Sequence, residues 1–276
     1  MIEVFAAVVG LLVGPVLRLA VDRVPGRLPL FGTRPEAVGA SVGRDLSPVV
    51  SWWSATTPGV IAPVGSPDDV ADGEARATRV RRWRAPAIDL VTAVVFAALA
   101  SRFGTTAALP AMLVFGAALV TVSVIDVDHY RIPDRVVFPA LGLCTVLLAV
   151  ASLVDDIDGA MVGAAVGAIA YFGFLFIFFL VSPSGMGFGD VKLALLLGLV
   201  LGWTGAVQEV DGVLVAGGLV DSFRLVLYGG LAGSVLGSLV GVVVISVRGR
   251  RAHFPFGPSL CLGALGVVLL SGPTLG

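Results

Sequence analysis

Apolar runs long enough to cross a lipid bilayer recur along this 276-residue chain, and they constrain its fold more than any other feature. They lie near residues 2–21, 87–104, 107–125, 136–154, 159–181, 190–207, 225–247 and 256–272. Hydrophobic residues make up 57% of the chain and charged residues only 13%, with a mean hydropathy of +1.00, which excludes a soluble globular domain. We therefore expect an all-α polytopic membrane protein with about eight transmembrane helices.

The distribution of positive charge predicts how the chain is oriented. Lysine and arginine accumulate in the cytoplasmic loops of membrane proteins. Eight alternating spans would place most of the 18 basic residues on one side, namely those between residues 23 and 84 together with Arg131, Arg135, Lys192, Arg248, Arg250 and Arg251. The opposite side would hold only Arg102 and Arg224. We therefore expect the N-terminus outside the cell and the run ends near residues 125 and 190 at the cytoplasmic face.

Three segments follow from the pattern of apolar runs. Residues 1–22 are expected to form a first transmembrane helix, residues 23–85 a cytoplasmic loop, and residues 86–276 a seven-helix core. The loop is rich in proline, glycine and serine with scattered charges, which is typical of a loosely structured excursion. It contains no cysteine, and Cys144 and Cys261 lie inside apolar runs. We therefore expect neither a disulfide framework nor a metal site.

A Gly-x-Gly-Asp motif stands where a polar stretch becomes an apolar run. Ionisable residues in membrane helices are energetically costly and usually functional, which directs attention to Asp190. Gly187 and Gly189 allow a tight turn and leave this carboxylate uncrowded. The alternative interpretation is that Asp190 caps the N-terminus of its helix, a position that aspartate favours.

A second cluster of aspartates follows the apolar run that ends at Ile125. Asp126 directly ends that run, Asp128 would be a solvated neighbour, and Asp134 would cap the next helix. Spacing alone does not choose between them. Two carboxylates in a medium of low dielectric constant cannot both ionise easily, so they share a proton. One can then deprotonate a water molecule while the other protonates a peptide carbonyl, which is the minimum for acid–base peptide hydrolysis.

The motifs around both carboxylates resemble those of the type IV prepilin peptidases, a bacterial family of membrane aspartyl proteases of the GxGD type. They are Ile125-Asp126 with Ile132-Pro133-Asp134 downstream, and Gly187-x-Gly189-Asp190-x-Lys192-Leu193. Further matches to the family pattern occur, in order, at Val9–Pro25, Pro86–Gly104, Leu201–Trp203 and Phe254–Pro258. The resemblance therefore covers most of the chain.

The resemblance implies that Asp126 and Asp190 are the catalytic pair, with supporting roles for Gly187, Gly189, Lys192 and Asp134. Lys192 would tune the pair or extend its charge to the membrane surface. The implied substrate is a prepilin or pseudopilin whose short basic leader is cut at the cytoplasmic face of the bacterial inner membrane. The lipid bilayer is the other expected partner. Neither a cofactor nor a nucleic acid is expected, and the sequence does not indicate an oligomeric state.

The chain also departs from the family pattern. Many members carry two Cys-x-x-Cys pairs in the first cytoplasmic loop and also methylate the new N-terminus. The loop here has no cysteine, which excludes zinc binding of that kind and argues against methylation. Pro15 and Arg18 replace the usual serine and asparagine, and Asp89 stands where glutamate is usual.

A different class of protein, a small ion-coupled transporter, is the alternative to a peptidase. Such carriers tend to have inverted repeats and carboxylates near the middle of the bilayer. Neither feature is visible in this sequence, because the acidic residues cluster at the ends of the apolar runs.

Overall fold

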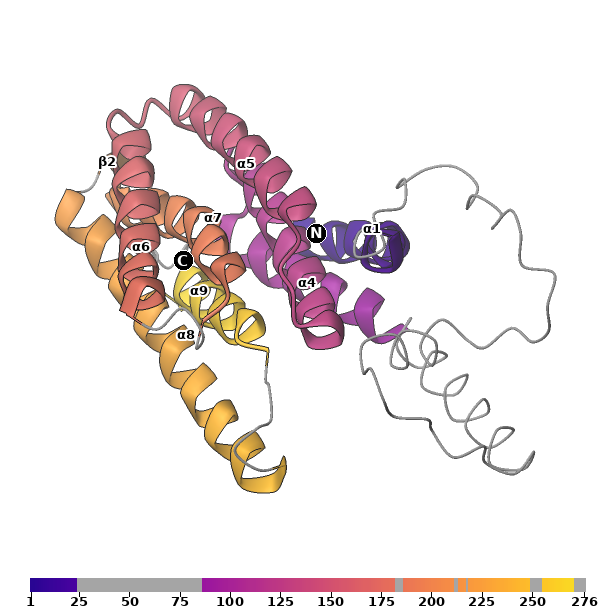
Figure 1. Cartoon of the computed structure of the whole chain (residues 1–276). Coiled ribbons are helices and arrows are strands. Elements are labelled where there is room, and N and C mark those ends of the chain that lie inside the picture. The colour runs from indigo at the N-terminus through magenta and orange to yellow at the C-terminus, as the bar shows by residue number, and fades with distance from the viewer. Residues whose placement is uncertain (24–85, 182–185, 211–212, 217, 249–254, 271–276) are drawn as a thin grey trace, which may run out of the picture. The chain divides into compact units, whose positions relative to one another are not determined.

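The residues that the structure describes fold almost entirely into helices, which follow the expected apolar runs (Figure 1). The computed structural model describes residues 1–23, 86–181, 186–210, 213–216, 218–248 and 255–270. Its helices are α1 (Ile2–Arg23), an unlabelled helix (Pro86–Phe103), α4 (Leu109–His129), α5 (Asp134–Val154), α6 (Ala160–Val181), α7 (Phe188–Ala206), α8 (Leu219–Arg248) and α9 (Gly257–Leu270). Most of the loop expected at residues 23–85 lies outside the described residues, and the division into three segments stays a prediction.

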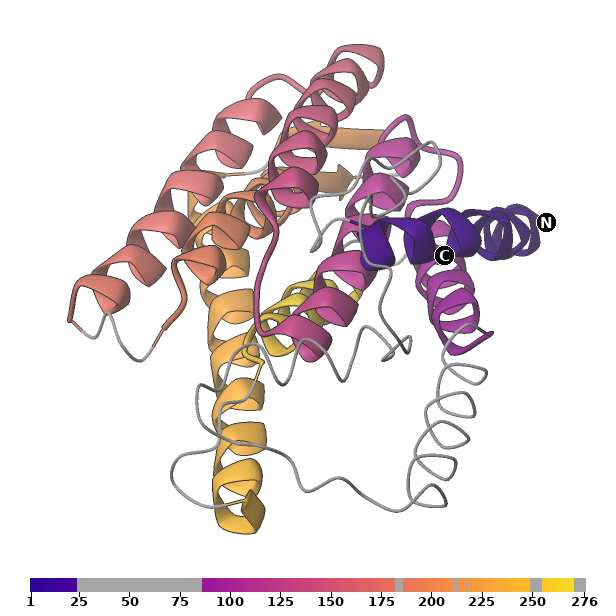
Figure 2. The same cartoon turned by 45° about the vertical axis from the view of Figure 1, so that its right-hand side comes forward.

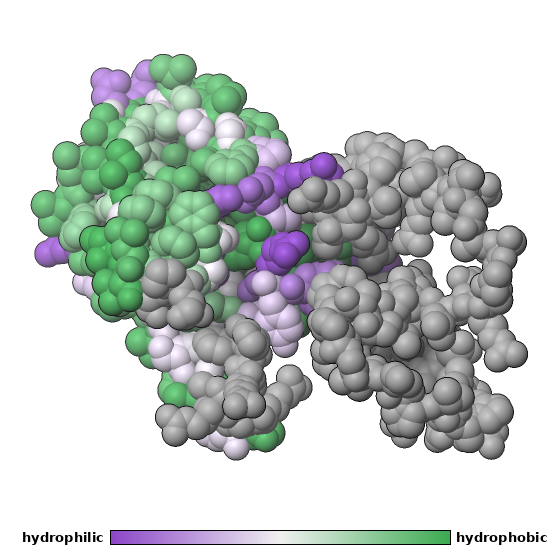
Figure 3. All heavy atoms as spheres, viewed as in Figure 1, coloured by the Kyte–Doolittle hydropathy of each residue, from purple (hydrophilic) through white to green (hydrophobic). Residues whose placement is uncertain are grey.

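Six of these helices, within the described ranges, are long and apolar enough to cross a membrane. They are the helix Pro86–Phe103, α4, α5, α6, α7 and residues Leu219–Val244 of α8. Large apolar side chains are exposed on their outer surfaces, and the face shown in Figure 3 is mostly hydrophobic over the helices. The expected all-α polytopic membrane fold is confirmed, whereas the outward orientation of the N-terminus stays a prediction.

The first and last helices occupy the other two expected runs. Helix α1 has 22 residues, and α9 has 14, which gives α9 a length of about 21 Å at 1.5 Å per residue. That is shorter than the hydrocarbon core of a bilayer, which is about 30 Å thick. Helix α8, with 30 residues, is the longest described helix, as Figure 2 also shows.

One short sheet interrupts the helices. Strands β1 (Val207–Val210) and β2 (Val213–Ala216) pair antiparallel, with Val207 opposite Ala216 and Val210 opposite Val213. The hairpin joins the end of α7 to the start of α8. The sequence interpretation did not anticipate it, because residues 208–224 lie between two expected apolar runs and were treated only as a connecting segment.

Helix α7 is the most enclosed of the candidate membrane-spanning helices, since 78% of its apolar segment is buried inside the protein. Its most extensive contact is with α6, where glycines face glycines. A Cβ on Gly198 would meet the carbonyl oxygen of Gly167, and a Cβ on Gly202 would lie 2.8 Å from the Gly167 Cα. Small residues let two membrane helices approach backbone to backbone. The position of α7, and therefore of Asp190, depends on this glycine interface.

Helices α5 and α7 are joined at both ends by polar side chains. Near their N-terminal ends, Lys192 of α7 pairs with Asp134 of α5. Near their C-terminal ends, the Trp203 indole N–H donates to the Ser152 hydroxyl at 2.9 Å. The two helices therefore run in the same direction, and their starts lie at one end of the bundle.

Helix α1 is held against the helix Pro86–Phe103 by an ion pair. The Arg18 guanidinium lies 3.0 Å from the Asp89 carboxylate, and both side chains are partly buried. A Cβ on Gly10 would lie 2.8 Å from the Ala93 Cα, so the backbones nearly touch along the same interface. Arg18 and Asp89 both depart from the family pattern, and the structure places the two departures in contact.

Candidate active site

Asp126 lies in the last turn of α4 with its side chain directed into the protein. It is 5% exposed, and its Oδ2 accepts a hydrogen bond of 2.9 Å from the backbone N–H of Gly257, the first residue of α9. Helix α4 ends just beyond it, because Tyr130 adopts a left-handed conformation with φ 50°. The Tyr130 N–H closes the helix by donating to the Asp126 carbonyl oxygen at 2.8 Å, a common form of helix C-cap. Asp126 is therefore fixed by two helix ends.

Asp190 lies in the first turn of α7 and is also buried, with 7% exposure. The N-cap position is occupied by Gly187, and no side chain caps the helix. The interpretation of Asp190 as the N-cap is therefore wrong by three residues, because the helix begins earlier than the apolar run. Its Oδ2 lies near Gly187, where a Cβ would be 3.4 Å away, and its Oδ1 is buried with no hydrogen-bond partner among the described residues.

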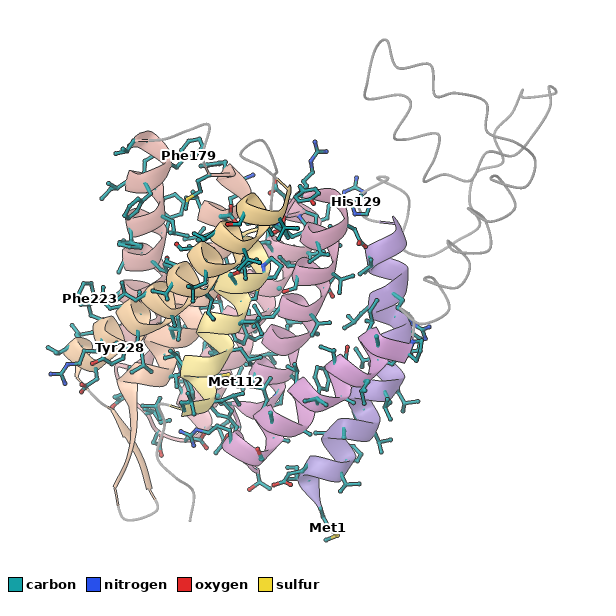
Figure 4. All side chains as sticks on the ribbon, turned by 90° about the horizontal axis from the view of Figure 1, so that it is seen from below. Met1, Met112, His129, Phe179, Phe223 and Tyr228 are labelled. Atoms are coloured by element: carbon teal, nitrogen blue, oxygen red, sulfur yellow. The ribbon has the colours of Figure 1, made fainter. Side chains whose placement is uncertain are left out.

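The two carboxylates come together although they are far apart in sequence. They are close enough for the charge of Asp126 to act on Asp190. Ile132 lies between the starts of α7 and α9. A Cβ on Gly189 of α7 would lie 2.9 Å from the Ile132 Cβ, and a Cβ on Gly257 of α9 would lie 3.3 Å from the Ile132 Cδ1. Both glycines are needed because a side chain at either position would displace its neighbours. Figure 4 shows His129, at the end of α4, and Phe179, near the end of α6, toward the same end of the bundle.

Two of the expected supporting residues adjoin the acidic pair, and the other two bond to each other. Gly187 and Gly189 border Asp190 directly. Lys192 instead donates to both carboxylate oxygens of Asp134, at 2.9 and 2.8 Å, and its ammonium group lies over the rings of Phe138 and Phe188. Lys192 therefore bonds to Asp134 and joins the starts of α5 and α7.

Asp134 and Asp128 are distinguished from Asp126 by their surroundings. The N-cap of α5 is Pro133, and Asp134 is the first helical residue, with no side-chain cap. The interpretation of Asp134 as a cap is therefore wrong; it is a partly exposed ion-pair partner instead. Asp128 is half-buried, whereas Asp126 is the buried residue bonded to α9.

Two residues of the site were not assigned a role from sequence. Gly257 donates the hydrogen bond that holds Asp126, and Ile132 fills the space between the helix starts. Both residues stand within motifs that carry the family resemblance. The motifs therefore marked these positions but did not indicate which residues they contact. Among the described residues, no group of three or more histidine, cysteine or acidic side chains is arranged to hold a metal ion.

The arrangement is suited to acid–base chemistry. Two buried carboxyl groups that sense each other's charge are most stable when they share one proton. Such a pair can accept a proton from water and donate one to a carbonyl oxygen. The backbone N–H of Gly257 fixes the orientation of one member of the pair without occupying the other.

Comparison with known proteins agrees with the motifs. Residues 113–243, which contain both carboxylates, match the model of the Type IV leader peptidase family. Over these residues the chain is similar to the type IV leader peptidase family. The resemblance identified from the motifs is confirmed.

Curated relatives bear names of the same kind. The prepilin leader peptidase/N-methyltransferase of Pseudomonas aeruginosa is 30% identical over 182 residues, covering 65% of this chain and 56% of the relative. Its namesake in Bacillus subtilis is 32% identical over 180 residues, covering 65% and 63%, respectively. That of Myxococcus xanthus is 28% identical over 255 residues, covering 90% and 64%. The chain thus spans about three fifths of the length of these relatives, and no solved structure matches it.

Proposed function

We propose that this protein is a membrane-embedded aspartic endopeptidase that removes the short basic leader from prepilins or pseudopilins. The observation that carries the proposal is the buried pair of Asp126 and Asp190 at neighbouring helix ends. The names of the curated relatives support the choice of substrate. The cleavage would take place at the cytoplasmic face of the bacterial inner membrane.

In the proposed reaction, one carboxylate takes a proton from a water molecule as the water oxygen attacks the scissile carbonyl carbon. The other carboxyl donates a proton to the carbonyl oxygen, which gives a neutral tetrahedral intermediate. Collapse of the intermediate breaks the C–N bond: the leaving nitrogen takes up a proton from the pair, and one hydroxyl group of the intermediate returns a proton to the pair as it becomes the carbonyl of the new C-terminus. The protein forms no covalent bond with the substrate in this scheme.

The test is cleavage of a purified prepilin by the protein in lipid vesicles. The wild-type protein is expected to release the leader, and Asp190→Ala is expected to release none, because one half of the proton relay is missing. Equal cleavage by both proteins would contradict the proposal. Mass spectrometry of the product also tests methylation. Because residues 23–85 contain no cysteine, we propose that the protein does not methylate the new N-terminus and expect an unmodified terminus in the presence of a methyl donor. A methylated terminus would contradict this second proposal.

The proposed orientation can be tested by labelling single cysteines in cells. Arg44→Cys should be protected from an impermeant external thiol reagent, and Asp156→Cys should react. The positive charges favour a cytoplasmic position for the loop that contains residue 44 and not for the loop that contains residue 156. The background should be low because Cys144 and Cys261 are buried. External labelling at residue 44 would contradict the N-out topology.

The hydrogen bond from Gly257 to Asp126 leads to a prediction with a matched control. In Gly257→Ala, the new methyl group would lie 2.8 Å from Asp126 Oδ2 and must push the carboxylate aside. We expect cleavage to fall by about 100-fold, the effect of misplacing a reacting group by about 1 Å. Gly266→Ala changes another glycine of α9 that has no atom within 4 Å of the added carbon, and it should cleave like the wild-type protein. Initial rates for the two variants decide the matter, and equal rates would contradict the role of this contact.

A further inference from the structure

Tyr171 of α6 is a buried polar residue that the proposed mechanism does not use. Its side chain is fully buried, and its hydroxyl group has no hydrogen-bond partner among the described residues. Buried tyrosine hydroxyls usually find a partner, because burial of an unpaired polar group is unfavourable. A tyrosine retained here in place of phenylalanine therefore suggests a use for the hydroxyl.

The surroundings of Tyr171 place the phenol where α6 meets α8 and α9. A Cβ on Gly230 of α8 would lie 3.3 Å from the Tyr171 ring and 3.7 Å from its hydroxyl oxygen. The neighbouring Gly229 and Gly233 would meet α9 at Ala264 and Leu260, on either side of Cys261. The hydroxyl thus lies at the level of Cys261, inside the bundle.

The same interior region contains the acidic pair. Tyr171 is close enough to Asp190 and Cys261 for both groups to interact with it electrostatically. Cys261 in turn lies near Ser123 of α4, and the charges of Asp126 and Asp190 act on it. The phenol, the thiol and the two carboxyl groups form one buried polar cluster within an otherwise apolar core.

Two members of this cluster have complementary unpaired atoms. The Tyr171 hydroxyl can donate a hydrogen bond, and Asp190 Oδ1 can accept one, but neither has a partner among the described residues. They are not bonded to each other directly. Internal water molecules typically bridge buried polar groups that would otherwise be unpaired.

We propose that Tyr171 is a positioning residue of the peptidase site, whose hydroxyl acts through bridging water on Asp190 Oδ1 and fixes the orientation of that carboxyl group. The inference rests on the proposed peptidase function. It adds α6 to the elements that set the site, through a contact that lies deeper in the membrane bundle than the two aspartates.

The experiment compares Tyr171→Phe with Tyr228→Phe in the vesicle assay. Tyr171→Phe keeps the ring that packs on Gly230 and removes only the hydroxyl. We expect kcat to fall roughly tenfold with KM and the unfolding temperature unchanged, since the water-mediated hydrogen bond that orients Asp190 is lost. Tyr228 of α8 is 57% exposed, so its Phe variant is the control for the same chemical change and should keep the wild-type kcat.

The outcomes separate this inference from the proposed function. Wild-type kcat in Tyr171→Phe, with Asp190→Asn inactive, would overturn the inference and leave the peptidase intact. A raised KM at unchanged kcat would also overturn it, because the hydroxyl would then bind substrate instead of orienting Asp190. If the wild-type protein cleaves no prepilin, the proposed function fails and the inference fails with it.

Discussion

Asp126→Asn and Asp190→Asn should each abolish leader cleavage while the protein remains folded in the membrane. Asparagine matches aspartate in shape and keeps an oxygen that can accept the hydrogen bond from Gly257. It cannot take up or release the proton that the reaction moves. Because neither carboxyl group can perform the part of the other, we expect the rate in each variant to fall by at least about 1,000-fold. Single-turnover cleavage of a labelled prepilin in vesicles measures the loss.

The neighbouring aspartates supply the controls. Asp128→Asn and Asp134→Asn remove a charge of the same kind from the same segment, but Asp128 is only half-buried and Asp134 pairs with Lys192. Both variants should retain measurable activity. If Asp126→Asn cleaved prepilin and Asp128→Asn did not, the choice of Asp126 as the first member of the pair would be wrong.

Gly198→Ala should lower the free energy of unfolding more than any other substitution considered for the helix interfaces. The added carbon would meet the carbonyl oxygen of Gly167 and lie 2.9 Å from the Ala168 Cα, and both are backbone atoms that cannot move aside. Helix α7 would have to move away from α6. Overpacking of this kind costs about 1–3 kcal/mol or more, and we expect the upper end of that range. Denaturant titration in mild detergent measures the free energy of unfolding.

Gly173→Ala on α6 is the matched control for this experiment. No atom lies within 4 Å of the carbon that it adds. Alanine is also the better helix former, by up to about 1 kcal/mol, so this variant should be as stable as the wild-type protein or slightly more so. Equal unfolding free energies for Gly198→Ala and Gly173→Ala would show that the α6–α7 interface tolerates a methyl group, contrary to our prediction.

The sequence predicts the helices well because a bilayer imposes a length and a composition on each span. Its motifs also single out Asp126 and Asp190, because both stand in segments that resemble the motifs of the type IV prepilin peptidases. The three-residue error at Asp190 has a local cause: helix α7 starts within the glycine-rich motif, at Phe188, before the apolar run begins. A pattern of hydropathy does not locate an N-cap to the residue.

The contacts that complete the site depend on long-range packing. The hydrogen bond from Gly257 to Asp126 joins α9 to α4, and the ion pair of Lys192 with Asp134 joins α7 to α5. No local pattern specifies these partners. Tyr171 shows the limit most clearly, because in sequence it is one aromatic residue in an apolar run, and its unpaired hydroxyl becomes apparent only when its neighbours are known.

The ion pair between Arg18 and Asp89 has a consequence for building chimeras with relatives. Each residue replaces a different one in the usual family pattern, and each neutralises the other across the interface of the first two helices. Introducing the usual asparagine at position 18 alone would leave the partly buried Asp89 carboxylate without its counter-charge, a change more disruptive than loss of the pair as a whole. Helix α1 and the helix Pro86–Phe103 should therefore be exchanged together. A chimera that takes one of these helices from a relative should take both.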